Sequence, residues 1–190
     1  SIGVYLRDLQ LSYISNIVNA GKFSFAGLGN GDVYVYNIFS KPYFRSNLQI
    51  DSTALNGYPI GDLQVASMLD NRDNSILFGG NLVSNLSKVS SRIYGGIYLS
   101  RDSMCIDGDL HDIDLRFLRA YIGSVMENST GIATGRARAF GKFGNIGLQG
   151  DVFVKDFNFG IGFLNTQYTL TDTVHMTPTS FSLRNCPIND

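Results

Sequence analysis

Apolar and polar side chains alternate along most of this 190-residue chain, and that alternation constrains its fold more than any other feature. Leu48 and Ile50 stand two positions apart, as do Leu63 and Val65. Successive side chains of a β-strand point to opposite faces, so each pair lies on one face of a strand. The pattern therefore predicts an all-β protein.

The composition supports this fold class and excludes some partners. Charged residues make up 16% of the chain, and Glu127 is its single glutamate. Strong helix formers are scarce, whereas glycine (21 residues) and aromatic residues (12%) are plentiful. A net charge of -1 attracts no phosphate backbone, so nucleic acid is not expected as a partner. The length fits one domain, 1–190, and the start without methionine suggests a fragment of a longer chain.

Short turn-forming dipeptides punctuate the alternation. Glycine, asparagine and aspartate favour tight turns, and strands with such punctuation every 8–12 residues or so indicate successive hairpins. The dipeptides expected to form turns are Asn30-Gly31, Asn56-Gly57, Asp70-Asn71, Gly79-Gly80, Gly95-Gly96 and Asp107-Gly108.

Two segments depart from the strand pattern. Leu115, Leu118 and Ile122 follow helical spacing, and Asp112 or Asp114 can cap the start of a helix that Gly123 ends. A short amphipathic helix is therefore expected near 112–122. Residues 8–17 look like a weaker copy of it.

The two helical segments belong to a longer internal similarity. At a constant offset of 104, Asp8 matches Asp112, and Gly27 and Gly31 match Gly131 and Gly135. The shared order of features predicts divergent repeats over 8–107 and 112–190, within one elongated domain.

Motifs for chemistry are absent. The glycine-rich runs 27–31 and 135–142 do not fit nucleotide-binding loops. The acidic residues around His111 are explained by a turn and a helix cap, and His111 and His175 lie in no recognisable catalytic context. Cys105 and Cys186 are interpreted as two unpaired core residues, with a disulfide as the alternative. We expect no enzyme activity, no metal and no cofactor.

Four stretches together resemble a known family. They are residues 112–121, 131–141, 148–154 and 162–172. The earlier segments 31–35 and 60–63 show the same pattern of glycines and alternation. This pattern of glycines and alternation is similar to the TamB-type translocation and assembly modules of the AsmA-like superfamily, notably their Bacteroides-type members. The resemblance covers most of the chain and is strongest after Asp107.

The resemblance implies a location and a function. TamB-type proteins are long periplasmic β-structures, anchored in the inner membrane and reaching toward the outer membrane. Their sheet curls into a U-shaped apolar trough, the β-taco. The family is linked to moving phospholipids to the outer membrane and to assembling outer-membrane proteins. By this likeness, the chain is an internal periplasmic fragment that lacks the anchor and the outer-membrane contact region.

The residues themselves also favour a trough. A sheet with few covering helices must bury its apolar face by sandwiching, curling or binding another molecule. We expect a twisted antiparallel sheet whose trough contacts phospholipid acyl chains or outer-membrane protein substrates, and an exposed face that promotes dimerisation. The predicted lining comprises Leu48, Ile50, Leu63, Val65, Ile76, Phe78, Ile97, Leu99, Ile146, Leu148, Val152, Val154, Ile161 and Phe163.

Three functional interpretations remain open at this point. The first is a lipid conduit, and the second is a scaffold for outer-membrane protein assembly. The third is a carbohydrate-binding or adhesive β-module, with Tyr34, Tyr36 and Tyr43 as its platform. The sequence identifies neither the lipid nor the oligomeric state.

Overall fold

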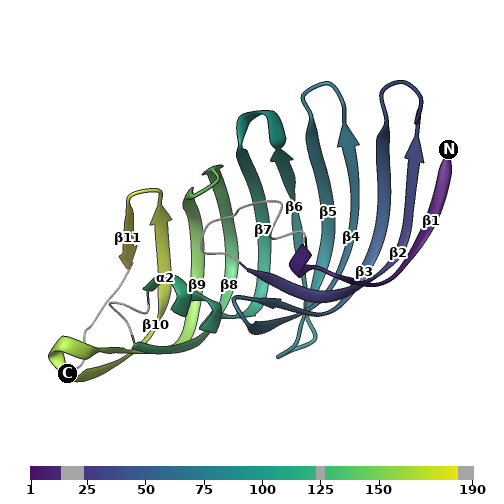
Figure 1. Cartoon of the computed structure of the whole chain (residues 1–190). Coiled ribbons are helices and arrows are strands. Elements are labelled where there is room, and N and C mark those ends of the chain that lie inside the picture. Colours follow the sequence, from purple (N-terminus) through teal and green to yellow (C-terminus); the bar gives the residue numbers. More distant parts are fainter. Residues whose placement is uncertain (14–23, 123–126, 184–190) are drawn as a thin grey trace.

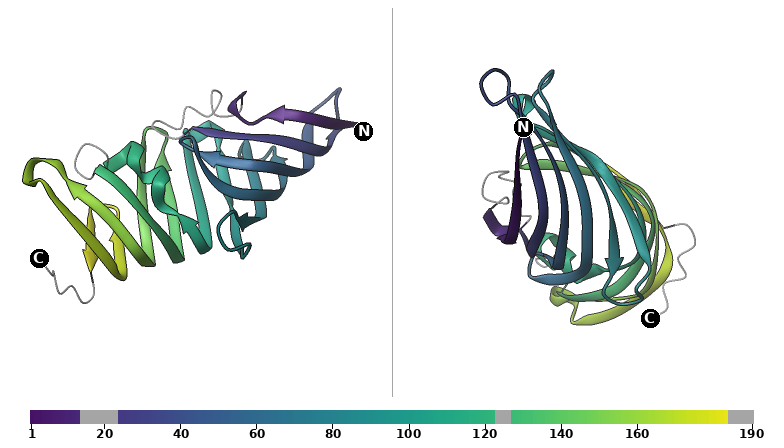
Figure 2. Two further views of the ribbon diagram at one scale, coloured as in Figure 1. Left: turned by 90° about the horizontal axis from the view of Figure 1, so that it is seen from below. Right: turned by 90° about the vertical axis from the view of Figure 1, so that its right-hand side faces the viewer.

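The computed structural model describes residues 1–13, 24–122 and 127–183 of the chain. Eleven strands form one antiparallel sheet, in which every strand pairs with its neighbours in sequence, from β1 to β11. Among the described residues, β1 pairs only with β2 and β11 only with β10, so the sheet is open. Figures 1 and 2 show that it twists along its length and that its strands curve into an open trough. The predicted fold class is therefore confirmed.

Short connections join most of the strands, as expected for hairpins. The strands are β1 (Ile2–Gln10), β2 (Phe25–Tyr36), β3 (Tyr43–Leu55), β4 (Tyr58–Asp70), β5 (Ser75–Ser84), β6 (Ser90–Tyr98), β7 (Ser103–Asp114), β8 (Glu127–Lys142), β9 (Asn145–Ile161), β10 (Thr166–Thr177) and β11 (Ser180–Leu183). The described helical segments include three short 3-10 helices, η1 (Leu99–Arg101), η2 (Leu115–Leu118) and η3 (Gly162–Leu164), and one short α-helix, α2 (Arg119–Ile122). In the described part of the chain, no helix has the length and apolar character needed to cross a membrane.

Four of the six predicted turns are wrong. Turns occur at Asn56-Gly57 and after Asp70, but the other four dipeptides lie within strands. They are Asn30-Gly31, Gly79-Gly80, Gly95-Gly96 and Asp107-Gly108.

Glycines in the middle of strands allow close approach between neighbouring backbones. Gly31 has a φ of +148°, and a Cβ there would lie 2.0 Å from the Asn47 carbonyl oxygen. A Cβ at Gly95 would lie 2.1 Å from the Cys105 carbonyl oxygen. Glycine inside a strand marks a bend or a close backbone approach, so these residues shape the curved sheet instead of ending its strands.

A recurring β-bulge supplies further curvature. In β1, β3, β7 and β9, two residues oppose a single residue of the next strand, and the second of the two has a positive φ. In each case its backbone N–H donates to a side-chain oxygen of the opposing residue, which satisfies a donor that the bulge would otherwise leave unpaired. The pairs are Asp8 to Asn30 (3.0 Å), Ser52 to Asp62 (3.0 Å), Asp112 to Thr134 (3.1 Å) and Asp156 to Thr171 (3.0 Å).

Residues matched by the 104-residue offset have equivalent backbone conformations. Asp8 and Asp112 both occupy the positive-φ position of a bulge. Gly27 and Gly131 have φ values of 148° and 143°, and Gly31 and Gly135 have 148° and 150°. The observation places corresponding bends at corresponding points of the two predicted repeats.

The predicted helix over 112–122 begins later than expected. Strand β7 continues to Asp114, because the bulge at Asp112 allows pairing to resume at Ile113. Asp114 then caps η2, since its side chain accepts a hydrogen bond from the Arg116 N–H. For the weaker copy over 8–17, Asp8 to Gln10 belong to β1, and 14–17 lie outside the described residues, as does Gly123.

The buried core consists of two clusters on one face of the sheet. The first contains Leu115, Ala133, Val152, Val154 and Phe157, and the second contains Ile60, Leu82 and Ile113. Phe117 packs against both clusters. The segment after β7 therefore covers part of a sheet that has no second layer among the described residues.

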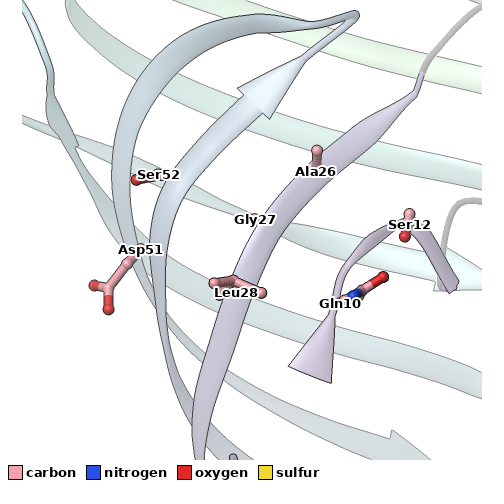
Figure 3. Close-up of a pocket in the computed structure, with 7 residues that line it drawn as sticks. All are labelled: Gln10, Ser12, Ala26, Gly27, Leu28, Asp51 and Ser52. Atoms are coloured by element: carbon pink, nitrogen blue, oxygen red, sulfur yellow. The ribbon is translucent and has the colours of Figure 1, made fainter. Parts of the chain in front are cut away.

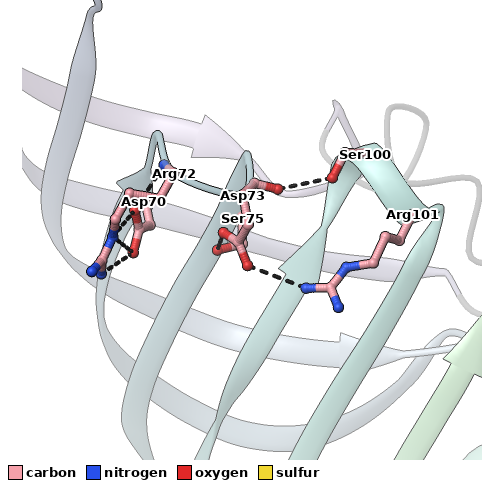
Figure 4. A network of polar contacts seen from close by, with 6 residues as sticks. All are labelled: Asp70, Arg72, Asp73, Ser75, Ser100 and Arg101. Atoms are coloured by element: carbon pink, nitrogen blue, oxygen red, sulfur yellow. Dashed lines mark hydrogen bonds and ion pairs between the residues drawn. The ribbon is translucent and has the colours of Figure 1, made fainter.

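A polar network holds the turn between β4 and β5 (Figure 4). Arg72 forms an ion pair of 2.6 Å with Asp70, and Asp73 accepts hydrogen bonds from Ser75, at 2.5 Å, and Ser100, at 2.8 Å. Arg101 reaches Asp73 at 3.2 Å. The network links this turn to the one that follows β6.

The Asp70–Arg72 pair predicts a pH dependence. Side-chain hydrogen bonds from Arg72 lower the pKa of Asp70 from 3.8 to about 2. The pKa is lower in the folded chain, so the pair stabilises the fold above about pH 4 and loses this effect as the pH falls toward 2. Asp70→Asn should slightly lower the urea midpoint at about pH 6, and the difference from the unmodified protein should shrink between about pH 4 and 2. A difference that stays constant over that range would contradict the assignment.

Candidate functional site

The register of the sheet brings most of the predicted lining residues onto one face. Leu48 pairs directly with Val65, and Ile50 pairs with Leu63. Directly paired residues of neighbouring strands lie on the same side of the sheet. We call this side the apolar face.

The remaining strands continue the apolar face. Ile76 of β5 pairs with Ile97 of β6, which also pairs with Met104 of β7. In β9, Ile146 and Leu148 oppose Gly141 and Ala139 of β8. The predicted residues that the pairings place on this face are Leu48, Ile50, Leu63, Val65, Ile76, Phe78, Ile97, Ile146, Leu148, Val152, Val154 and Ile161.

Leu99 and Phe163 are the two predicted residues outside the strands. Leu99 is the first residue of η1, and Phe163 lies in η3. Neither residue continues the alternation of the strand before it, because β6 ends at Tyr98 and β9 ends at Ile161.

Several face residues were missing from the predicted set. Phe157 and Phe159 follow the β9 bulge. Even-numbered residues face inward before this bulge, and odd-numbered residues face inward after it. Period-two spacing from predicted members does identify others: Leu82 lies four positions after Phe78, and Ile93 lies four positions before Ile97. The further members are Val33, Val35, Phe44, Leu69, Leu82, Ile93, Met104, Ile106, Leu110, Phe157, Phe159, Val174 and Met176.

Exposure differs between the two sides of the sheet. Along β4, Leu63 and Val65 are half-buried, whereas their neighbours Gln64 and Ala66 are exposed. Side chains on the inner side of a curved sheet converge and shield one another, while those on the outer side spread apart. The difference indicates that the apolar face is the inner side of the trough.

Polar side chains on the apolar face hydrogen-bond within the protein. The hydroxyl groups of Ser46 and Ser67 lie 2.6 Å apart on paired positions of β3 and β4. Ser84 donates to the Asp112 carbonyl at 2.8 Å, and Ser91 donates to the His111 carbonyl at 3.4 Å. Hydroxyl groups paired in this way do not offer a free polar partner to a ligand, although the face is not uniformly apolar, because Asp172 also lies on it, opposite Val154.

The outer face carries a row of alternating basic and acidic side chains. Arg92, Asp109, Arg136, Asp151 and His175 stand directly opposite one another across β6 to β10. Asp151 lies 2.7 Å from the His175 Nδ1, and Asp109 lies 4.0 Å from Arg136. Exposed pairs stabilise little individually, but opposite charges across strands favour one register over a slipped one.

The acidic residues around His111 are held apart by their own partners. Asp107 forms an ion pair of 2.7 Å with Arg138 and, through this hydrogen bond, raises the pKa of the Arg138 guanidinium. Asp114 pairs with Arg116 at 2.6 Å and raises the pKa of that guanidinium in the same way. Among the described residues, no three histidine, cysteine or acidic side chains group closely enough to hold a metal ion. The turn that was expected to explain Asp107 is absent, because Asp107 lies inside β7.

Two hollows occur among the described residues. One has a volume of about 210 Å³, near the bulges of β1 and β3 (Figure 3). The other, of about 570 Å³, lies beside η1 and the end of β8. The first is lined by Gln10, Ser12, Ala26, Gly27, Leu28, Asp51 and Ser52, and the second by Ser100, Arg101, Asp102, Ser103, Gly141 and Lys142.

The three tyrosines of the carbohydrate-binding interpretation lie on the outer face, because Tyr34 and Tyr36 stand two residues apart in β2 and Tyr43 pairs with Tyr36. The rings of Tyr36 and Tyr43 stack on each other at 4.8 Å, while Tyr34 is 45% exposed and lies beside Gly3. Cys105 is a half-buried free thiol, and Cys186 lies outside the described residues.

Comparison with known proteins provides no relative for this chain. No protein-family model matches it, and neither the curated proteins nor the solved structures contain a match. The trough itself is therefore the basis for any functional proposal.

Proposed function

We propose that this chain is a periplasmic segment of a TamB-like protein whose apolar face binds phospholipid acyl chains during transport to the outer membrane. The observation that supports this best is the continuity of the face. Aliphatic and aromatic residues occupy the same side of the sheet from β2 to β10, and the sheet remains open. The sequence resemblance to TamB-type modules supports the location and the direction of transport.

The chemistry of the face suits an acyl chain. Each methylene group that leaves water contributes about 0.8 kcal/mol, so a 16-carbon chain gains roughly 10 kcal/mol before entropic losses. The hydroxyl groups of Ser46 and Ser67 are already paired with each other. A bound chain can therefore slide along the face without breaking a directional hydrogen bond at each step.

A photoreactive palmitate analogue tests the proposal. We expect cross-links at half-buried members of the apolar face, such as Leu48, Val65 and Ile97, because these side chains combine apolar surroundings with some exposure. Mass spectrometry of the digested protein locates the cross-links. The proposal is wrong if the analogue does not cross-link, or if it labels exposed outer-face residues such as Gln64 and Arg92 equally.

Assembly of outer-membrane proteins is a second candidate function, and the same open apolar face supports it. The strands of outer-membrane proteins alternate apolar and polar side chains, so the apolar side of an unfolded strand can lie against this face. Cross-linking of a peptide with alternating polarity to Leu48 and Val65, without palmitate labelling of these residues, would favour this function over lipid transport.

A further inference from the structure

A short segment of the chain already occupies part of the apolar face. This segment, Leu115–Ala120, is named here the strap; it comprises η2 and the start of α2 and lies beside β8 at the lower end of the sheet in Figure 1. Leu115 is 7% exposed and packs in the cluster that contains Val152 and Val154. Phe117 and Leu118 pack against the same cluster. The strap therefore covers one part of the trough with apolar side chains.

Polar contacts at the rim hold the strap in place. The Arg119 Nε donates to the Ser129 carbonyl at 2.8 Å, and its guanidinium lies 5.5 Å from the centre of the Tyr58 ring. The Asn56 amide donates to the Phe117 carbonyl at 3.2 Å. Arg119 and Asn56 are half-buried, whereas Ser129 is fully buried, so the Asn56 contact is the one that water replaces at the smallest net loss of free energy.

The strap has few contacts of its own that would keep it folded. Its helical parts are single turns of four residues each, far shorter than a helix that is stable alone in water. Its position depends on the apolar face, on the Asp114–Arg116 ion pair at its start and on the contacts of Arg119 and Asn56. Segments with such limited local stability open more readily than the strands beneath them.

We propose that the strap is an internal occupant of the apolar face and that an acyl chain displaces it. This inference rests on the proposed function. Leu115, Phe117 and Leu118 provide the face with the same apolar contacts that a hydrocarbon chain provides. Strap and cargo compete for one surface, so occupancy by one raises the free energy of binding the other.

Hydrogen exchange measured with and without palmitate tests the competition. Palmitate should increase amide exchange across 114–120 in the unmodified protein. Arg119→Ala should increase exchange there without palmitate. It should also tighten palmitate binding by about five-fold, because the strap bound to the apolar face loses the contribution of about one hydrogen bond. Arg101→Ala is the matched control, because Arg101 likewise makes a polar contact (an ion pair of 3.2 Å with Asp73) and lies over a tyrosine ring (4.4 Å, Tyr98), away from the strap.

The outcomes separate this inference from the proposed function. If palmitate binds while exchange across 114–120 is unchanged or slower, the strap is not displaced and only the conduit proposal stands. If palmitate binds neither the unmodified protein nor Arg119→Ala, the proposed function fails and this inference fails with it. Binding by Arg119→Ala alone supports displacement. Should Arg119→Ala unfold, Arg119→Lys, which keeps the charge but loses the planar donor group, is tested against the same outcomes.

Discussion

Replacing Gly150 by alanine is expected to destabilise the protein by about 3 kcal/mol, since a strained backbone and a steric clash each contribute. Gly150 lies in the middle of β9 with a φ of +147°, which residues with side chains rarely adopt. A Cβ there would lie 2.1 Å from the Arg136 carbonyl oxygen and 2.9 Å from the Ala137 Cα. Both contacts are with backbone of β8, so relief requires the two strands to separate. Urea denaturation followed by circular dichroism measures the loss.

Gly144→Ala is the matched control for this prediction. Gly144 has a φ of +83°, but a Cβ there would meet no atom within 4 Å. Its replacement should therefore cost about 1 kcal/mol, from backbone conformation alone. Equal losses for Gly144→Ala and Gly150→Ala would show that close approach between β8 and β9 does not determine the path of the strands.

The strand glycines explain why the fold class was predictable and the strand boundaries were not. Alternation along single strands predicts a β-protein without knowledge of pairing, and pairs such as Leu48 and Ile50 do share a face. Gly79-Gly80 and Gly95-Gly96 have the composition of hairpin turns. Their role in the middle of strands depends on the neighbouring backbone, as the 2.1 Å approach at Gly80 to the Gln64 carbonyl shows. That approach is a property of the assembled sheet, not of local sequence.

Bulges limited the prediction of the apolar face in a similar way. In β9, Val152 and Val154 face inward, and strict alternation would place Phe157 on the outer side. The bulge at Lys155 and Asp156 inserts one residue, and Phe157 is consequently buried beside Val154. A clue is present in the sequence, because aspartate or serine occupies the positive-φ position of the four bulges described above, but only the pairing distinguishes these residues from turn formers.

The structure also changes which residue best tests the trough. Val152 belongs to the predicted lining, and from alternation alone an arginine there is expected to block the lipid while an open trough keeps its fold. Val152 is only 6% exposed and packs in the same cluster as Leu115. An arginine there would lose apolar packing and place a charge beneath the strap, so the domain should be destabilised whether or not lipid binds. A half-buried position away from the strap is required.

Val65→Arg meets that requirement and should reduce palmitate cross-linking by at least about ten-fold, because a charge in the path of a hydrocarbon chain costs more than the 1.4 kcal/mol that a factor of ten requires. Val65 lies between Leu48 and Gly80 in the middle of the apolar face and is half-buried. Its replacement should lower the free energy of unfolding by only about 1 kcal/mol, since the valine is partly exposed already and the arginine head group can reach water.

Ala66→Arg provides the control in the adjacent position. Ala66 belongs to the same strand but faces the outer side, opposite Asn47 and Gly79, and it is exposed. Both variants add the same charge to β4, so a general effect of charge on palmitate would reduce labelling in both. We expect cross-linking to be lost in Val65→Arg and retained in Ala66→Arg, with circular dichroism spectra that match the unmodified protein. Unfolding of Val65→Arg would indicate a closed packing surface, and retained labelling in a folded Val65→Arg would show that acyl chains bind elsewhere.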